Sequence, residues 1–105
     1  MTLDEILQDI HALEEDLQNY ERKYGVLSET FYESYIAGEE PADDAWVLDW
    51  SGWAGAYQIL VARRQQYREL MANLKATTSL PTIIERTARR EPLQSLSAMR
   101  CMFTP

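Results

Sequence analysis

The sequence is poor in the residues that build metal and disulfide sites, with one cysteine, Cys101, and one histidine, His11, among 105 residues. A single cysteine excludes an internal disulfide, and this pair alone cannot form a zinc site of the Cys/His type. We expect His11 to lie on the surface or at the edge of a helix seam. Cys101 lacks a second histidine or another base to activate it, so we expect an inert thiol.

The N-terminus also lacks the basic start and the apolar run of a signal peptide, so we expect a cytoplasmic protein. The most apolar segment, residues 46–62, contains Asp49 and is shorter than the roughly 20 apolar residues that a bilayer core requires. We therefore do not expect a membrane span. With 46% hydrophobic and 26% charged residues, the chain has the composition of one small folded domain.

Basic residues are scarce in the first half of the chain. Residues 1–50 hold 14 acidic side chains against two basic ones, and residues 51–105 hold three against eight, so net charges of −12 and +5 sum to −7. An acidic surface repels phosphate and attracts cationic partners. The first half therefore favours a basic protein partner over nucleic acid, which only the basic tail is suited to contact. Pairing between the two halves and an ordinary solvated surface remain the alternatives.

Apolar residues at helical spacing predict two long helices with a short one between them. Thr2 and Glu5 have the spacing of a capping box, and Gly25 suits the C-terminal cap of the helix that follows. Ser28 and Gly38 have the types that cap and stop a second, short helix. Pro41 breaks the chain, and Asp43 or Asp44 can cap the third helix. The seams of the two long helices comprise Leu3, Ile6, Ile10, Leu13, Leu17, Tyr20 and Tyr24, and then Trp46, Trp50, Trp53, Tyr57, Leu60, Arg64, Tyr67, Met71 and Leu74.

The expected fold class is all-α: an antiparallel helical hairpin of two long helices, bracketed by the short middle helix, over residues 1–76. From Thr77 the sequence changes character, because Thr78, Ser79 and Pro81 interrupt the helix and basic residues follow. We expect residues 77–105 to form a basic C-terminal tail, either partly helical or docked on a partner. The apolar residues available for short helices there are Ile83, Ile84, Leu93, Leu96, Met99, Met102 and Phe103.

The start of the third helix is apolar on every side. From Trp46 to Ala62 the only residues that are neither apolar nor glycine are Asp49, Ser51 and Gln58, and they form no continuous polar face. A helix covered all round needs more neighbours than two other helices supply. We therefore expect a homodimer that forms a helical bundle, with an interface at Trp50, Gly52, Trp53 and Tyr57. A local kink at the glycines and an aromatic ligand cage are the alternatives.

Paired E-x-x-E or E-x-x-D motifs on adjacent helices would indicate a magnesium-dependent all-α nucleotide hydrolase. Only Glu40 and Asp43 match, and they lie in a turn. The sequence therefore predicts no enzyme, no catalytic residue, no metal site and no cofactor. The nucleotide hydrolase is the third of the functional hypotheses.

Over about residues 13–62, the order and spacing of a set of residues resembles the pattern of a family of small prokaryotic antitoxin-like proteins. These proteins are partners in toxin–antitoxin systems. The pattern reads K-Y-G-x-x-S-E-x-F-Y, then G-E, D-D and W, and its residues are Lys23, Tyr24, Gly25, Ser28, Glu29, Phe31, Tyr32, Gly38, Glu39, Asp43, Asp44 and Trp50. The chain departs from the pattern at Asp49, where glutamate is expected, and in its tail from Thr77.

The resemblance implies a non-enzymatic protein that neutralises a basic toxin, such as a nuclease whose groove normally receives phosphate. Acidic residues on one turn beside aromatic anchors suit such binding. The expected partner-binding residues are Phe31, Tyr32, Tyr35, Glu39, Glu40, Asp43, Asp44 and Trp46. The alternative hypothesis is a structural or assembly module that forms a homo-oligomeric helical bundle, in which the acidic turn only caps helices.

Overall fold

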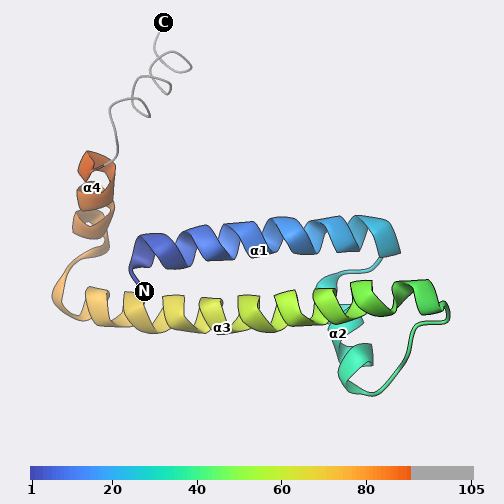
Figure 1. The fold of residues 1–105 in the computed structure, drawn as a ribbon. Coiled ribbons are helices and arrows are strands. Elements are labelled where there is room, and N and C mark those ends of the chain that lie inside the picture. Colours follow the sequence, from blue (N-terminus) through green and yellow to red (C-terminus); the bar gives the residue numbers. More distant parts are fainter. Residues whose placement is uncertain (91–105) are drawn as a thin grey trace, which may run out of the picture. The chain divides into compact units, whose positions relative to one another are not determined.

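A computed structural model describes residues 1–90, which form four α-helices and one short 3-10 helix and contain no strand (Figure 1). The predicted all-α class is confirmed. The helices are α1 (Leu3–Tyr24), α2 (Ser28–Ile36), α3 (Val47–Thr77) and α4 (Leu80–Arg90), with the 3-10 helix η1 (Asp44–Trp46) before α3. The chain divides into two units, Met1–Leu70 and Met71–Pro105. The predictions for Cys101 and for the apolar residues after position 90 lie outside the described residues.

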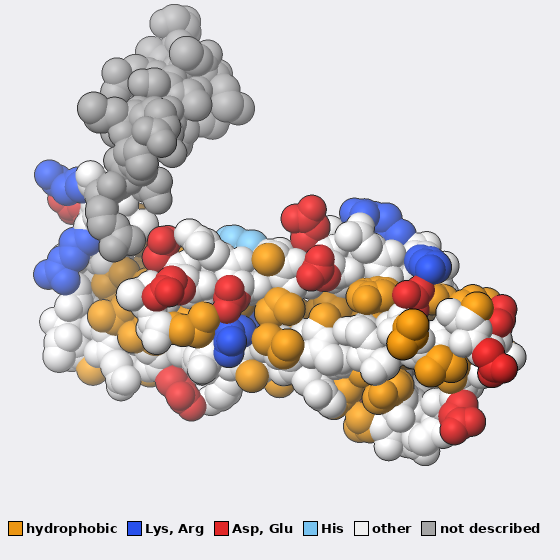
Figure 2. Space-filling model, viewed as in Figure 1, with side chains coloured by type: hydrophobic (Ala, Val, Ile, Leu, Met, Phe, Trp, Pro, Cys, Tyr) orange, Lys and Arg blue, Asp and Glu red, His pale blue; other side chains and the backbone are white. Residues whose placement is uncertain are grey.

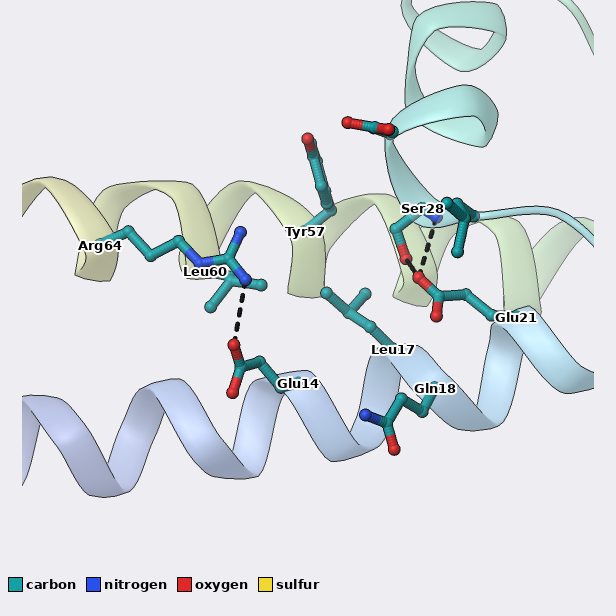
Figure 3. Close-up of a pocket in the computed structure, with 10 residues that line it drawn as sticks. Glu14, Leu17, Gln18, Glu21, Ser28, Tyr57, Leu60 and Arg64 are labelled. Carbon is teal, nitrogen blue, oxygen red and sulfur yellow. Dashed lines mark hydrogen bonds and ion pairs between the residues drawn. The ribbon is translucent and has the colours of Figure 1, made fainter.

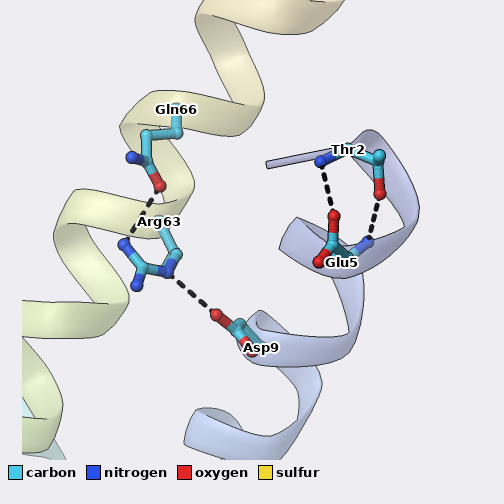
Figure 4. A network of polar contacts seen from close by, with 5 residues as sticks. All are labelled: Thr2, Glu5, Asp9, Arg63 and Gln66. Carbon is cyan, nitrogen blue, oxygen red and sulfur yellow. Dashed lines mark hydrogen bonds and ion pairs between the residues drawn. The ribbon is translucent and has the colours of Figure 1, made fainter.

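The caps of α1 are those predicted from the sequence. The Thr2 hydroxyl accepts a hydrogen bond from the Glu5 amide at 3.2 Å, and the Glu5 carboxylate accepts one from the Thr2 amide at 3.0 Å (Figure 4). The bond from the Thr2 backbone also lowers the pKa of Glu5. At the other end Gly25 has a φ of +80°, and its amide donates to the Glu21 carbonyl. Glycine adopts this left-handed conformation without steric cost, so α1 ends at Tyr24.

The core of the first unit lies where α1, α2 and α3 meet. Seven buried apolar residues form it: Ile6, Ile10, Leu17, Phe31, Trp53, Ala54 and Leu60. Those from α1 belong to its predicted seam, and the seam residues Leu13, Tyr20 and Tyr24 pack against the same cluster. The predicted seam of α3 supplies Trp53 and Leu60. The period of three and four residues therefore identified the faces that α1 and α3 turn toward each other.

Three ion pairs join α1 to α3. Arg63 Nε lies 3.0 Å from Asp9 Oδ2, and Gln66 holds the same guanidinium from its other side (Figure 4). The second pair joins Arg64 to Glu14 at 3.0 Å, and the third joins Lys23 to Asp49 at 2.6 Å. The first half of α1 thus faces the middle of α3, while the end of α1 faces the start of α3. The two long helices therefore pack against each other along these ion pairs.

Ser28 has a different role from the one predicted. It is the first residue of α2 rather than its N-cap, and Leu27, which precedes it, makes no side-chain capping bond. The Ser28 hydroxyl is engaged by α1 and α3 instead. At its other end α2 stops at Ile36, with Ala37 as the cap, and Gly38 follows at a φ of +92°. The predicted stop at Gly38 is therefore correct to within two residues.

Asp43 caps the turn before α3, because its carboxylate accepts a hydrogen bond from the Ala45 amide at 2.9 Å. From Val47 the helix continues unbroken through Gly52 and Gly55. One chain covers only one side of α3, since Leu48 is 85% exposed and Ile59 46% exposed. The expectation of a helix covered on every side is not met within a single chain.

The second unit contains the end of α3 and all of α4. The last turn of α3 ends at Thr77, where the sequence predicts the break. Ser79 then lies at the start of α4, and its hydroxyl contacts Thr82 Oγ1 at 2.9 Å. Part of the predicted tail is therefore helical, over Leu80–Arg90.

Candidate functional site

A buried polar node, centred on Ser28, connects the three helices of the first unit. Ser28 is 3% exposed, and both its amide and its hydroxyl donate to Glu21 Oε2, at 2.9 and 2.7 Å (Figure 3). The Trp53 indole N–H donates to the same hydroxyl at 2.9 Å. One serine therefore satisfies a carboxylate of α1 and an indole of α3, and a buried group that lost its partner there would be costly.

A pocket of about 350 Å³ lies beside this node, between α1, α3 and the start of α2 (Figure 3). Two of its carboxylates are already engaged, because Glu21 accepts from Ser28 and Glu14 pairs with Arg64. These bonds cross from one helix to another. We interpret this pocket as part of the joint between the helices, since its polar groups serve the fold.

Trp53 is the centre of an aromatic stack and is 1% exposed. The Phe31 ring lies parallel to it, with centroids 3.8 Å apart and an interplanar angle of 1°. Tyr24 and Tyr20 also stack on it, at 5.6 and 5.7 Å. Each of the three helices contributes at least one of these rings, so the stack joins all of them.

A second and larger pocket, of about 510 Å³, opens next to this stack. We call it the aromatic pocket. Phe31 and Trp53 are buried and form its base, whereas Trp46 is 38% exposed. Its remaining lining residues are Lys23, Tyr24, Val26, Thr30, Ser34, Glu39 and Trp50. Five aromatic rings therefore surround a space large enough for a side chain of a partner.

The buried indole N–H of Trp50 has no hydrogen-bond partner within residues 1–90. The Trp50 ring stands edge-on to Phe31, with centroids 5.2 Å apart and an interplanar angle of 85°. An aromatic face is only a weak acceptor for an N–H group. Trp50 and Trp53 thus differ sharply, because only the Trp53 indole is satisfied by an oxygen.

At one edge of the aromatic pocket, Lys23, Tyr24 and Asp49 form a network. Lys23 Nζ and the Tyr24 hydroxyl each donate to Asp49 Oδ2 at 2.6 Å. The bond from Lys23, and then that from Tyr24, lowers the pKa of Asp49. The bond to Asp49 in turn raises the pKa of Lys23, while burial and then that same carboxylate raise the pKa of Tyr24. The charge of Lys23 is therefore balanced by Asp49.

The acidic turn after α2 is exposed and mostly unpaired. Glu39, Glu40, Asp43 and Asp44 are all exposed, and within residues 1–90 none of them forms an ion pair. Asp43 is engaged in capping, whereas the other three carboxylates make no side-chain hydrogen bond within that range. Figure 2 shows acidic and hydrophobic side chains gathered together at the end of the molecule that carries α2 and the following loop.

The structure brings together part of the predicted partner-binding set. Phe31, Glu39 and Trp46 line the aromatic pocket, whereas Glu40, Asp43 and Asp44 are not among its lining residues. Tyr32 and Tyr35 lie elsewhere. Tyr32 packs on Tyr57 at 4.9 Å between centroids, and its hydroxyl accepts a hydrogen bond from Gln58. Tyr35 packs on Phe31 and Tyr32.

The residues predicted for a dimer interface pack largely within the chain. Trp53 belongs to the core, and Trp50 and Tyr57 are half-buried against it. Gly52 makes a close approach to α1, because a Cβ atom at this position would lie 2.8 Å from the Tyr20 hydroxyl. The apolar residues that α3 leaves exposed are instead Val47, Leu48, Ile59 and Val61.

Sequence reasoning did not assign Tyr24, Lys23 or Asp49 to the site. Signals for all three were present, since Lys23 and Tyr24 belong to the quoted pattern and Asp49 is the one charge within an apolar segment. From the sequence, Tyr24 is assigned to the seam of the first long helix, and Lys23 only to the quoted pattern. Their links to Asp49, 26 and 25 residues further on, become visible only when α1 and α3 are packed together.

Within residues 1–90 no three histidine, cysteine, aspartate or glutamate side chains gather in a way suited to a metal ion. None of the helices in the same range combines the length and the apolar character needed to cross a bilayer. His11 is exposed on α1, as expected.

Comparison with protein-family models, with curated proteins and with solved structures returns no match to this chain. The resemblance to antitoxin-like proteins therefore stays a prediction from the sequence pattern.

Proposed function

We propose that this chain is a non-enzymatic, antitoxin-like protein that binds a basic protein and neutralises it. The observation that carries the proposal is the exposed acidic turn beside the aromatic pocket. Glu39, Glu40 and Asp44 have no ion-pair partner within residues 1–90, so their charge is available to a partner. A charged rim around an aromatic centre is the arrangement in which interface binding energy concentrates.

The proposed mechanism is occupation of a basic groove. Residues 1–50 carry a net charge of −12, and such a field accelerates the encounter with a cationic surface. Carboxylates placed in a groove that normally receives phosphate would exclude its substrate. A nuclease is the class of toxin that this mechanism suits best.

Growth of cells that express the product of the neighbouring gene, with and without this chain, tests the proposal. The informative variant is E39K/E40K, in which both side chains are exposed and neither has an ion-pair partner within the described range. Its matched control is E15K/D16K, which reverses two adjacent exposed carboxylates on α1. We expect the wild type and the control to restore growth and E39K/E40K to fail. Equal rescue by both variants would contradict the role of the turn.

The second candidate function is a homo-oligomeric assembly module, and the exposed apolar face of α3 favours it. Leu48 and Ile59 are eleven residues apart, which places them on the same side of the helix, with Gly55 and Ala62 between or beside them. This stripe carries no charge, so two copies can pack it symmetrically against each other without repulsion. We propose that the α1–α3 hairpin dimerises into a four-helix bundle through this stripe.

Light scattering of L48Q/I59Q beside the wild type tests the dimer. We expect the wild type to have twice the mass of one chain and the variant to have the mass of one chain, with an unchanged helical signal in circular dichroism. A wild type that stays monomeric at micromolar concentration would contradict the dimer. A dimer that survives the double substitution would place its interface elsewhere.

A further inference from the structure

We propose that the aromatic pocket receives an arginine side chain of the basic partner. The inference rests on the proposed function and specifies which group of the partner enters which part of this chain. Trp46 and Glu39 are exposed residues of the pocket lining, and the buried rings of Phe31 and Trp53 close the base. The volume of about 510 Å³ exceeds what one side chain fills, so the flanking backbone of the partner also enters.

The walls of the pocket suit a cation. Aromatic faces attract positive charge, with Trp as the strongest and Tyr next. Lys23 already shows this contact, because its Nζ atom lies 5.5 Å from the centroid of the Tyr24 ring. The charge of Lys23 is balanced by Asp49 at 2.6 Å, which leaves the Glu39 carboxylate as the uncompensated charge in the lining. An entering cation would therefore meet the exposed Trp46 ring and a free carboxylate.

Arginine fits this combination better than lysine or an apolar residue. The guanidinium group is planar, stacks on aromatic rings and presents a fork of N–H donors to a carboxylate. An ammonium group is more strongly hydrated and loses more on entering an apolar space. A leucine or phenylalanine side chain would contact the rings but would leave Glu39 without a partner and gain nothing from the charge of residues 39–44.

Tryptophan fluorescence reports on this pocket directly, because Trp46, Trp50 and Trp53 are the only tryptophans of the chain and all of them line it. The probes are the peptide acetyl-Gly-Gly-Arg-Gly-Gly-amide and its analogues with citrulline, lysine and leucine at the central position. Citrulline keeps the shape of arginine and removes its charge. We expect a saturable fluorescence change that is tightest for arginine and roughly tenfold weaker for citrulline.

Two variants locate the binding. W46L removes the exposed ring and keeps an apolar side chain, and E39K reverses the charge in the lining. Both sites lie outside the buried core, and circular dichroism checks that the helices are retained. We expect each variant to reduce the affinity for the arginine peptide several-fold and E15K/D16K to leave it unchanged. Loss of the preference for arginine over citrulline in W46L is the sharpest expected result.

Equal binding of the arginine, citrulline and leucine peptides would overturn the assignment of arginine. The absence of any saturable fluorescence change up to ~10 mM peptide would overturn it as well. The proposed function can be judged separately by the growth assay. If rescue still requires Glu39 and Glu40 while the peptides show no preference, the basic partner stands and its arginine anchor is wrong. If E39K/E40K rescues growth like the wild type, the proposed function itself fails.

Discussion

The Phe31 ring lies on the Trp53 indole with centroids 3.8 Å apart and an interplanar angle of 1°. This contact joins the short helix α2 to the long helix α3 at the base of the aromatic pocket. Replacing Phe31 by alanine should destabilise the fold by about 3–5 kcal/mol, because it leaves a cavity beside a buried tryptophan. Chemical denaturation followed by circular dichroism measures this loss. A cost below about 1 kcal/mol would contradict the central position of the stack.

Two tryptophan substitutions make a matched pair. W53F removes the indole that donates to Ser28, whereas W50F removes an indole N–H that has no acceptor within the described residues. We expect W53F to lower the free energy of unfolding by about 1–3 kcal/mol more than W50F does, because only W53F leaves the buried Ser28 hydroxyl without a donor. Urea denaturation of both variants gives the difference. Equal costs would show that the bond to Ser28 contributes little.

The serine at the node allows a second comparison. S28A removes the hydroxyl that connects Glu21 to Trp53, and we expect it to cost about 1–3 kcal/mol of unfolding free energy. The control is S34A on the same helix, whose hydroxyl forms no hydrogen bond within residues 1–90, and we expect it to change stability by less than about 0.5 kcal/mol. If S28A proved as mild as S34A, the node would not hold the three helices together.

The two glycines of α3 should respond differently to alanine. A Cβ atom at Gly55 meets nothing within 4 Å, so G55A should stabilise the isolated chain by about 1 kcal/mol through helix propensity. At Gly52 the new atom would lie 2.8 Å from the Tyr20 hydroxyl, and displacing this tyrosine should cancel that gain. Thermal unfolding measures both. If G55A weakens a dimer while it stabilises the monomer, a second copy packs against Gly55.

The Asp49 network predicts a pH dependence with two limits. The pKa of Asp49 is lowered in the folded chain. Its contribution to the free energy of unfolding is therefore present above the unfolded pKa of about 4 and is lost as the pH falls through the folded pKa. The pKa values of Lys23 and Tyr24 are raised. Their contribution to the free energy of unfolding is therefore complete below about pH 10 and disappears as the pH rises through their folded pKa values.

D49N is the variant that tests this dependence. It removes the carboxylate that receives both Lys23 and Tyr24. The variant should be less stable than the wild type at neutral pH, and the difference should shrink toward both acid and alkaline pH. Denaturation midpoints measured across the pH range would show this. A difference that stays constant with pH would indicate that the network contributes no charge-dependent stability.

The helices and their ends could be predicted because their signals are local. The spacing of Ile6, Ile10 and Leu17 defines the buried face of α1, and the cap at Thr2 needs only the following turn. The role of Ser28 could not be derived in this way. A serine before a helix is usually a cap, and its use by Glu21 and Trp53 depends on how three helices pack.

The candidate site was predictable only in part for the same reason. Glu39, Phe31 and Trp46 lie close in sequence, and their grouping follows from the short loop between α2 and α3. Tyr24 and Lys23 reach the pocket because of the register in which α1 packs along α3. This register cannot be predicted from the sequence. Tyr32 lies on the same short aromatic helix as Phe31 and Tyr35, yet its ring packs against Tyr57.

Direct binding between this purified chain and the purified product of the neighbouring gene decides whether the acidic turn recognises a basic protein. Isothermal titration at about 50 mM and about 300 mM salt separates a charge-driven complex from an apolar one, because salt screens exposed charges. We expect a complex that is tighter at low salt, is weakened by E39K/E40K and is unaffected by E15K/D16K. A complex that is indifferent to salt and to both variants, or no complex at all, would contradict it.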